Sequence, residues 1–162
     1  MLKSATIPLL LVFLAMVGCQ TTGMDSAAYT RARFFLESVS SEGYGAAVAL
    51  PVSGIHIPLQ GQAIVSEYDY LAVDVVDVDL GRCLVFTLKP AAAREFYQIS
   101  VGNQGKRLVL IVNGEPLGVR LIDGPIADGR IFVFLEVSDS NLMELARKLK
   151  ETNFDIQKKL KR

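Results

Sequence analysis

The stretch of residues 105–137 constrains the fold of this chain more than any other feature of its sequence. Two apolar runs, 108–112 and 117–122, flank the dipeptide Asn113-Gly114. Asn-Gly between β-branched runs predicts a hairpin, because both residues accept the positive φ that a tight primed turn requires. A third apolar run, 131–137, follows a longer turn that contains glycine and proline. The sequence therefore predicts a three-stranded meander onto which the remaining elements pack.

More strands are expected before this meander. Residues 33–39 predict a strand that places Phe34 and Phe35 on opposite faces, because successive side chains of a strand alternate. The apolar segment 46–58 is interpreted as an edge strand or an extended loop, since Pro51 and Pro58 interrupt it. Further strands are predicted at residues 63–67, 71–79 and 82–88.

Two or three helices complete the prediction. Pro90 opens the first, because proline at the first helical position lacks only a donor that the helix does not use, and Gly102 suits its end. Ser138 and Asp139 open a second helix with an apolar stripe. Residues 153–162 are expected to form a short third helix. The stripe consists of Leu142, Leu145, Ala146 and Leu149. The elements together predict a single α+β domain, a mixed or antiparallel sheet with the helices packed on one face.

Length and charge limit the classes of function. A chain of 162 residues fits one domain and can bury a real core. Seventeen basic residues balance 17 acidic ones, so the total charge gives no indication of a nucleic-acid partner. One histidine and no tryptophan argue against multi-histidine metal sites and aromatic stacking platforms. The glycines also lack the spacing of a nucleotide-binding loop. From charge, composition and glycine spacing together we expect no cofactor and no nucleic acid.

The N-terminal segment predicts a location for the protein. Met1-Leu2-Lys3 gives a short positive start, residues 7–17 are apolar, and Gly18-Cys19 follows. This arrangement resembles a bacterial lipoprotein signal, in which the cysteine receives a diacylglyceryl group and the signal is cut before it. An uncleaved membrane helix is the alternative, but the apolar stretch falls short of the ~20 residues that span a bilayer.

The lipoprotein resemblance implies an organisation for the whole chain. Residues 1–18 are then the signal peptide, 19–30 a polar tether attached through Cys19, and 31–162 the folded domain. Two or three acyl chains anchor a protein stably, whereas one chain is marginal. Gln20 follows the cysteine where an aspartate would mark retention, which resembles outer-membrane sorting. We therefore expect a lipid-anchored domain that faces the periplasm of the cell envelope.

Three aspartates invite a metal-site hypothesis. Asp77-x-Asp79-x-Gly81, with Asp74 nearby, resembles the start of a calcium loop. Such a loop needs glycine at its sixth position and a bidentate glutamate at its twelfth, and here those positions hold Arg82 and Leu88. Alternation of valine and aspartate is typical of a half-exposed strand, so we predict no metal site.

The remaining candidate groups are weighed against structural roles. His56, between two isoleucines, could act as a base, but no serine lies in a nucleophile elbow, so the residues predict no catalytic site. Cys83 lies in an apolar run and is expected to be a buried, inert thiol. Five glycines are interpreted as turn residues rather than as a phosphate loop: Gly105, Gly114, Gly118, Gly124 and Gly129.

A pattern of motifs across residues 64–149 resembles a known family. The matching positions in chain order are Glu67 and Asp69; Phe96, Ile99 and Ser100; Asn103, Gly105 and Lys106; Asn113 and Gly114; Ile126 and Gly129; Leu145 and Ala146. In order and spacing they resemble the head part of the first periplasmic domain of SecD and SecDF, the protein-export membrane proteins. Leu135-Glu136 departs from the pattern, where that family tends to have glycine.

The resemblance implies an α+β module that contacts exported polypeptide. It does not extend to the transmembrane helices that couple proton flow to export in that family, so the motor function is not carried over. Three hypotheses stay open. The first is a non-catalytic envelope lipoprotein that engages polypeptide or a partner protein through a sheet edge or a groove beside the helices. The others are a hydrolase or ligand-binding enzyme around His56 and a structural envelope lipoprotein.

Overall fold

The computed structural model describes residues 28–39 and 46–161. Within these residues the chain forms eight strands and two helices, which confirms the predicted α+β class. In chain order they are β1 (Ala32–Glu37), β2 (Ala47–Ala49), β3 (His56–Val65), β4 (Tyr70–Val78), β5 (Gly81–Leu88), α1 (Pro90–Gly102), β6 (Arg107–Val112), β7 (Glu115–Leu121), β8 (Arg130–Leu135) and α2 (Asp139–Leu160).

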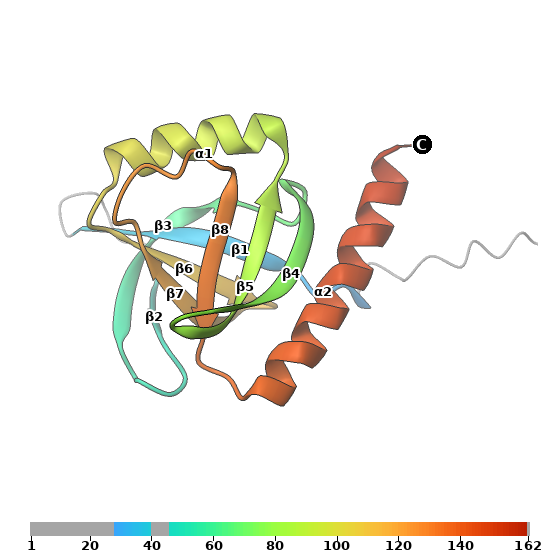
Figure 1. The fold of residues 1–162 in the computed structure, drawn as a ribbon. Coiled ribbons are helices and arrows are strands. Elements are labelled where there is room, and N and C mark those ends of the chain that lie inside the picture. The colour runs from blue at the N-terminus through green and yellow to red at the C-terminus, as the bar shows by residue number, and fades with distance from the viewer. Residues whose placement is uncertain (1–27, 40–45, 162) are drawn as a thin grey trace, which may run out of the picture.

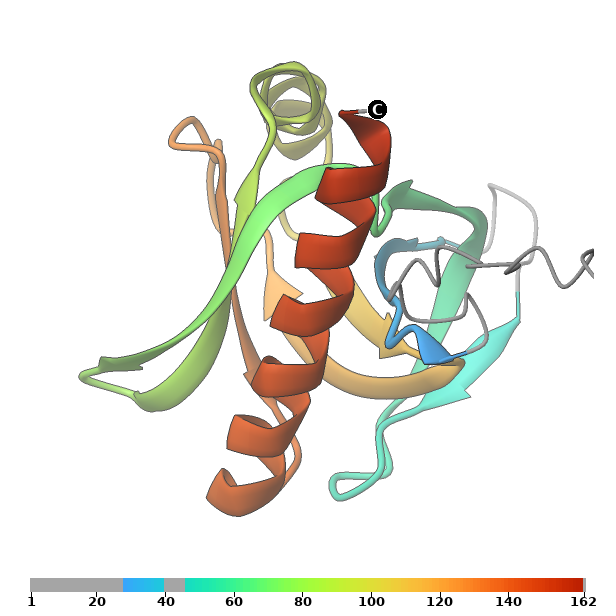
Figure 2. The same ribbon diagram turned by 90° about the vertical axis from the view of Figure 1, so that its right-hand side faces the viewer.

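The described strands form one open sheet in the order β2-β3-β1-β6-β7-β8-β5-β4, and each neighbouring pair is antiparallel. Of the two predicted alternatives, a mixed or an antiparallel sheet, the antiparallel one is therefore observed. Helix α1 crosses one end of the sheet, and α2 runs beside β4 (Figure 1). The sheet is strongly bent, so that β4, β5 and β8 face the other strands across the interior (Figure 2).

The central hairpin forms as the sequence predicts. Strands β6 and β7 pair up to Val112 and Glu115, and the two residues between them make the turn. Asn113 has φ 51° and Gly114 has φ 91°, the two positive values that a primed turn requires. The Asn113 side chain also accepts a hydrogen bond from the Arg31 backbone N–H at 2.8 Å. The turn is thus joined to the start of β1.

Gly118 is not a turn residue, and that prediction is wrong. It lies inside β7, where it is buried and pairs with Leu135 of β8. A Cβ atom built on Gly118 would lie 2.4 Å from the carbonyl oxygen of Phe134, a distance that real Cβ atoms essentially never reach. Glycine is therefore required because two backbones approach closely, which is one of the common reasons for glycine in a strand.

The main core lies between one face of the sheet and both helices. Phe34 and Tyr70 contact the ring of Phe86 edge to face, with centroid distances of 4.9 and 5.2 Å. Phe96 of α1 and Leu149 of α2 belong to the same buried cluster. Both helices therefore pack on one face of the sheet, as predicted.

A second, smaller group of buried residues lies on the opposite face. It consists of Leu50, Ile57, Leu59 and Val109, and we call it the hairpin cluster because three of its members lie in or beside strands β2 and β3. Phe35 packs against this cluster, whereas its neighbour Phe34 lies in the main core. The predicted placement of these two residues on opposite faces is confirmed.

Helix α2 corrects one prediction. It continues without a break to Leu160, so the expected separate third helix is wrong. The buried side of the helix continues for two turns past Leu149 through the polar Thr152 and the apolar Ile156, whereas Phe154 is 72% exposed. The buried positions keep their helical period past Leu149. Among the described residues, neither helix has the length and apolarity needed to cross a membrane.

Candidate functional site

The structure does not bring together, among the residues it describes, those that the sequence analysis considered as candidates for a chemical role. Cys19 lies outside the described residues, so its lipid attachment stays a prediction. His56 is exposed, pairs with Ala49 of β2, and lines none of the pockets described below. Cys83 is buried as predicted, and burial raises the pKa of its thiol.

The three aspartates take part in surface ion pairs or lie exposed. Asp74 binds Lys150 at 3.0 Å and Asp77 binds Arg82 at 3.0 Å. Asp79 lies exposed in the turn that follows β4. Within residues 28–39 and 46–161, no three His, Cys, Asp or Glu side chains gather in a metal-binding arrangement.

Strand β4 is a long outer edge of the sheet. It spans nine residues and pairs only with β5, whereas the opposite edge, β2, has three residues. An edge strand presents N–H and C=O groups that a further strand can use. The end of the β4–β5 hairpin extends beyond α2 (Figure 2), and Val78 and Leu80 near its tip are exposed.

A groove of about 200 Å³ lies between β4 and α2, and we call it the edge groove. Its apolar walls include Leu71, which is 48% exposed, and Phe154. Asn153 and Gln157 of α2 both donate side-chain hydrogen bonds to the Tyr70 carbonyl, at 3.0 and 3.1 Å. The helix thus already satisfies the first carbonyl of the edge. The groove residues are Leu71, Ala72, Val73, Asp74, Lys150, Asn153 and Phe154.

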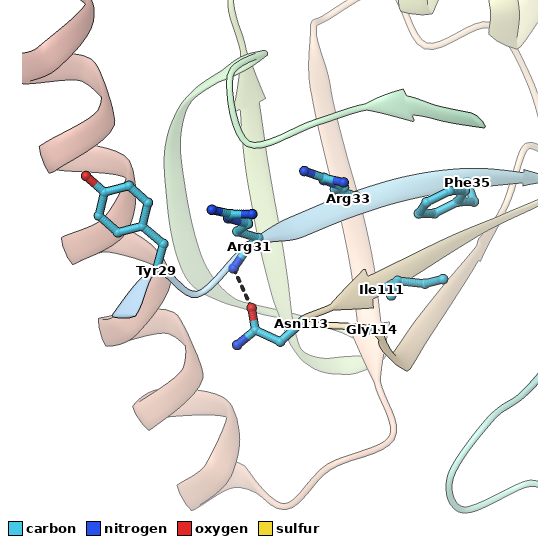
Figure 3. A pocket seen from close by; sticks show the side chains of 7 residues that line it. All are labelled: Tyr29, Arg31, Arg33, Phe35, Ile111, Asn113 and Gly114. Carbon is cyan, nitrogen blue, oxygen red and sulfur yellow. Dashed lines mark hydrogen bonds between the residues drawn. The ribbon is translucent and has the colours of Figure 1, made fainter. Parts of the chain in front are cut away.

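A larger pocket of about 610 Å³ opens on strands β1 and β6, and we call it the arginine pocket. Arg31, Arg33 and Phe35 lie in a row along the start of β1, with Ile111 on β6 beside them (Figure 3). They share one side of the strand because they alternate in sequence. The complete lining is Tyr29, Arg31, Arg33, Phe35, Ile111, Asn113 and Gly114.

A buried carboxylate holds the arginines of this pocket. Glu67, only 1% exposed, accepts two hydrogen bonds from Arg33 at 2.7 and 2.8 Å and lies 3.7 Å from Arg31. The hydrogen bond from Arg33 lowers the pKa of Glu67, so this buried group stays ionised at neutral pH. A bidentate arginine–carboxylate pair fixes the plane of the guanidinium. The orientation of Arg33 is therefore set before any ligand arrives.

Tyr29 forms the wall of the arginine pocket next to α2. Its hydroxyl donates a hydrogen bond to Asp155, and Lys159 donates to the hydroxyl at 2.6 Å. Lys159 also lies 5.0 Å from the centre of the tyrosine ring. The adjacent Thr30 backbone N–H binds Thr152 of α2 at 2.9 Å. Residues 29 and 30 thus lie against the folded domain, within the range expected to be tether.

The departure from the family pattern at Glu136 has a structural role here. Glu136 accepts the backbone N–H groups of Val52 and Ser53 at 2.8 and 2.9 Å, which holds the tip of the β2–β3 hairpin against the end of β8. Hydrogen bonds from Ser53 and Val52 lower the pKa of this carboxylate. A pocket of about 510 Å³ lies at this junction and also includes Ser138 and Asn141.

Two motif residues of the family resemblance, Ser100 and Asp69, support the fold. The hydroxyl of Ser100, fully buried, accepts the Ile126 backbone N–H at 2.9 Å and donates to the Tyr97 carbonyl at 2.7 Å. Asp69 accepts both the backbone N–H and the hydroxyl of Ser66, which closes the turn before β4. The sequence analysis did not find Arg31, Arg33 or Glu136 as functional candidates, because single charged residues carry no local signal.

Comparison with known proteins gives structural relatives. No family profile and no curated protein sequence matches the chain. Among solved structures, a crystal structure of SecDF in a super-membrane-facing form matches with a TM-score of 0.58 and 17% identity. A structure of SecDF described as a membrane component that enhances protein export matches with a TM-score of 0.59 and 16% identity.

The matches cover most of this chain but only part of each SecDF protein. They cover 75% and 76% of this chain, but this chain spans 19% of the first protein and 63% of the second. At this level of identity the likeness concerns the fold. The resemblance to SecD and SecDF that the sequence motifs indicate is therefore confirmed as a shared α+β fold.

Proposed function

We propose that this chain is a non-catalytic binding module of the cell envelope, attached to a membrane through Cys19, which engages extended polypeptide or a partner protein. The observation that carries the proposal is the long outer strand β4, paired on one side only and flanked by the edge groove. One SecDF structure is described as that of a membrane component that enhances protein export. The fold shared with SecDF therefore supports a role related to export. The domain then contacts a polypeptide without changing it.

Strand addition is the mode of binding that fits this edge. An extended segment can pair with β4, so that backbone hydrogen bonds supply affinity and sequence preference stays weak. Every second side chain of that segment then faces the edge groove, where Leu71 and Phe154 offer apolar contacts. We expect dissociation constants of about micromolar to millimolar, which suit a transient client.

An NMR titration of the isotopically labelled protein with unfolded secretory sequences tests the proposal. Amide shifts should concentrate on residues 71–78 of β4 and on the facing turns of α2. Phe154→Ala should weaken binding, whereas Met143→Ala should not, because Met143 is also exposed on α2 but does not line the edge groove. Absence of shifts with every peptide would contradict polypeptide binding.

The enzyme hypothesis remains the main alternative and has its own test. The exposure of His56 and its absence from the pockets described above favour the non-catalytic proposal. Peptide binding should survive His56→Ala, and a broad hydrolase screen should give no turnover that depends on His56. Turnover lost in that variant would support a hydrolase instead.

The membrane attachment is tested separately. Metabolic labelling with a fatty acid should mark the protein, and Cys19→Ser should abolish both the label and cleavage of the signal. Outer-membrane sorting, expected from Gln20, is read from fractionation of the envelope. An unlabelled protein that keeps its first 18 residues in the membrane would contradict the lipoprotein interpretation.

A further inference from the structure

The arginine pocket presents hydrogen-bond donors to whatever enters it. Two guanidinium groups and the Asn113 amide line it, and none of its seven lining residues is acidic. Of the five N–H donors of Arg33, Glu67 accepts two, so the side chain keeps further donors in its planar fork. Such a lining is complementary to a group that accepts several hydrogen bonds and carries negative charge.

Apolar surface adjoins these donors. Phe35 and Ile111 line the same pocket and also pack against the hairpin cluster beneath it. The ring of Tyr29 closes the other end (Figure 3). A volume of about 610 Å³ falls within the range of small-ligand sites, so the pocket can hold a charged group together with a neighbouring apolar one.

Hydrogen bonds within the protein hold the residues that carry the donors. Glu67, which does not belong to the pocket lining, fixes the guanidinium plane of Arg33. The Arg31 backbone is held at both its N–H and its C=O by Asn113, at 2.8 and 3.0 Å. Preorganised donors cost less conformational entropy on binding than flexible surface side chains.

We infer that the arginine pocket recognises the carboxylate of an aspartate or glutamate side chain in a bound polypeptide, with the apolar residue beside it resting on Phe35 and Ile111. The inference rests on the proposed polypeptide binding and gives it a sequence preference. Strand addition at β4 supplies affinity that is nearly independent of sequence, whereas this pocket selects acidic–apolar pairs. Charge-assisted hydrogen bonds of this kind supply the selectivity.

Two capped peptides test the inference, and they differ only in having a carboxylate or an amide at one side chain. Both are extended and carry a central leucine, preceded by glutamate in one and by glutamine in the other. With the full chain in nonionic detergent, the glutamate peptide should bind about tenfold more tightly at low salt. The preference should shrink at high salt, because screening weakens partly exposed charge pairs. Equal affinities at low salt would overturn the inference.

Two variants assign the preference to the pocket. Arg31→Gln should remove the preference for the glutamate peptide over the glutamine peptide. Arg94→Gln is the matched control, since Arg94 is an exposed arginine on α1 outside the pocket, and it should keep the preference. In the unmodified protein, the side-chain N–H resonances of Arg31 and Arg33 should shift with the glutamate peptide. A preference that survives in Arg31→Gln would overturn the inference.

The remaining outcomes separate this inference from the proposed function. Shifts on β4 with no difference between the peptides would support strand addition and overturn the pocket. Shifts of both arginines with capped glutamate alone, without any peptide binding at β4, would support the pocket and contradict strand addition. Arginine shifts with inorganic phosphate or phosphatidylglycerol vesicles, but not with the glutamate peptide, would overturn the inference in favour of a phosphate ligand.

Discussion

The main core and the hairpin cluster lie on opposite faces of one sheet and differ in how they are built. The main core draws residues from both helices and from most strands of the sheet. The hairpin cluster has four buried residues, and the tip of the β2–β3 hairpin depends on one carboxylate, Glu136. Because hydrophobic stabilisation follows buried apolar area, the hairpin should open while the main core stays intact. The comparison separates global stability from local stability.

The largest expected effect comes from truncating the main core. Leu149→Ala removes a fully buried side chain where α2 meets the sheet, and it should lower the free energy of unfolding by about 2–5 kcal/mol. Denaturant unfolding monitored by circular dichroism measures this loss. A change below about 0.5 kcal/mol, typical of surface positions, would mean that α2 does not contribute to the main core.

The buried carboxylate behind the arginine pocket should add an acid-sensitive contribution. Glu67→Gln should cost about 1–3 kcal/mol at neutral pH, because it removes the charged hydrogen bonds from Arg33. The pKa of Glu67 is lowered in the folded state, so its contribution is present above the ordinary glutamate pKa and is lost as pH falls through the folded value. Unfolding curves of the two proteins should therefore converge in acid. A constant difference at all pH values would contradict this role.

A matched pair of isoleucines compares the two clusters directly. Ile131 lies in the main core and Ile57 in the hairpin cluster, and both are fully buried strand residues. Ile131→Val should lower global stability by about 0.5–1.5 kcal/mol. Ile57→Val should change global stability less and should mainly speed amide exchange in β2 and β3. Equal global losses would show that the two clusters unfold as one unit.

The smallest expected effect concerns the tip of the hairpin. Glu136→Gln should speed exchange of the Val52 and Ser53 amides by a factor corresponding to about 0.5–1 kcal/mol, since the bonds are partly exposed. Acid should act in the same direction, because the pKa of Glu136 is lowered in the folded state and its contribution is lost as pH falls through that value. Unchanged exchange at both amides would show that Glu136 does not hold the tip of the hairpin.

Local signals allowed much of the fold to be predicted. The first helix has the bounds indicated by Pro90 and Gly102, and the Asn113-Gly114 turn has the expected φ values, because each depends on a few adjacent residues. The candidate site could not be predicted in the same way. Glu67 lies 34 positions from Arg33, and Glu136 lies 84 positions from Val52, so only the folded chain brings these pairs together.

The close approach at Gly118 restricts how this sequence can diverge. Any side chain there would press on the Phe134 carbonyl at the join between β7 and β8, where only two residue pairs connect the halves of the sheet. The adjacent turn glycine, Gly114, has open space around it, so a residue that tolerates positive φ could replace it. Substitutions should therefore be tolerated at the turn between β6 and β7 but not at the join between β7 and β8. In a library of substitutions, Gly118 would tolerate no replacement while most of the exposed hairpin varied.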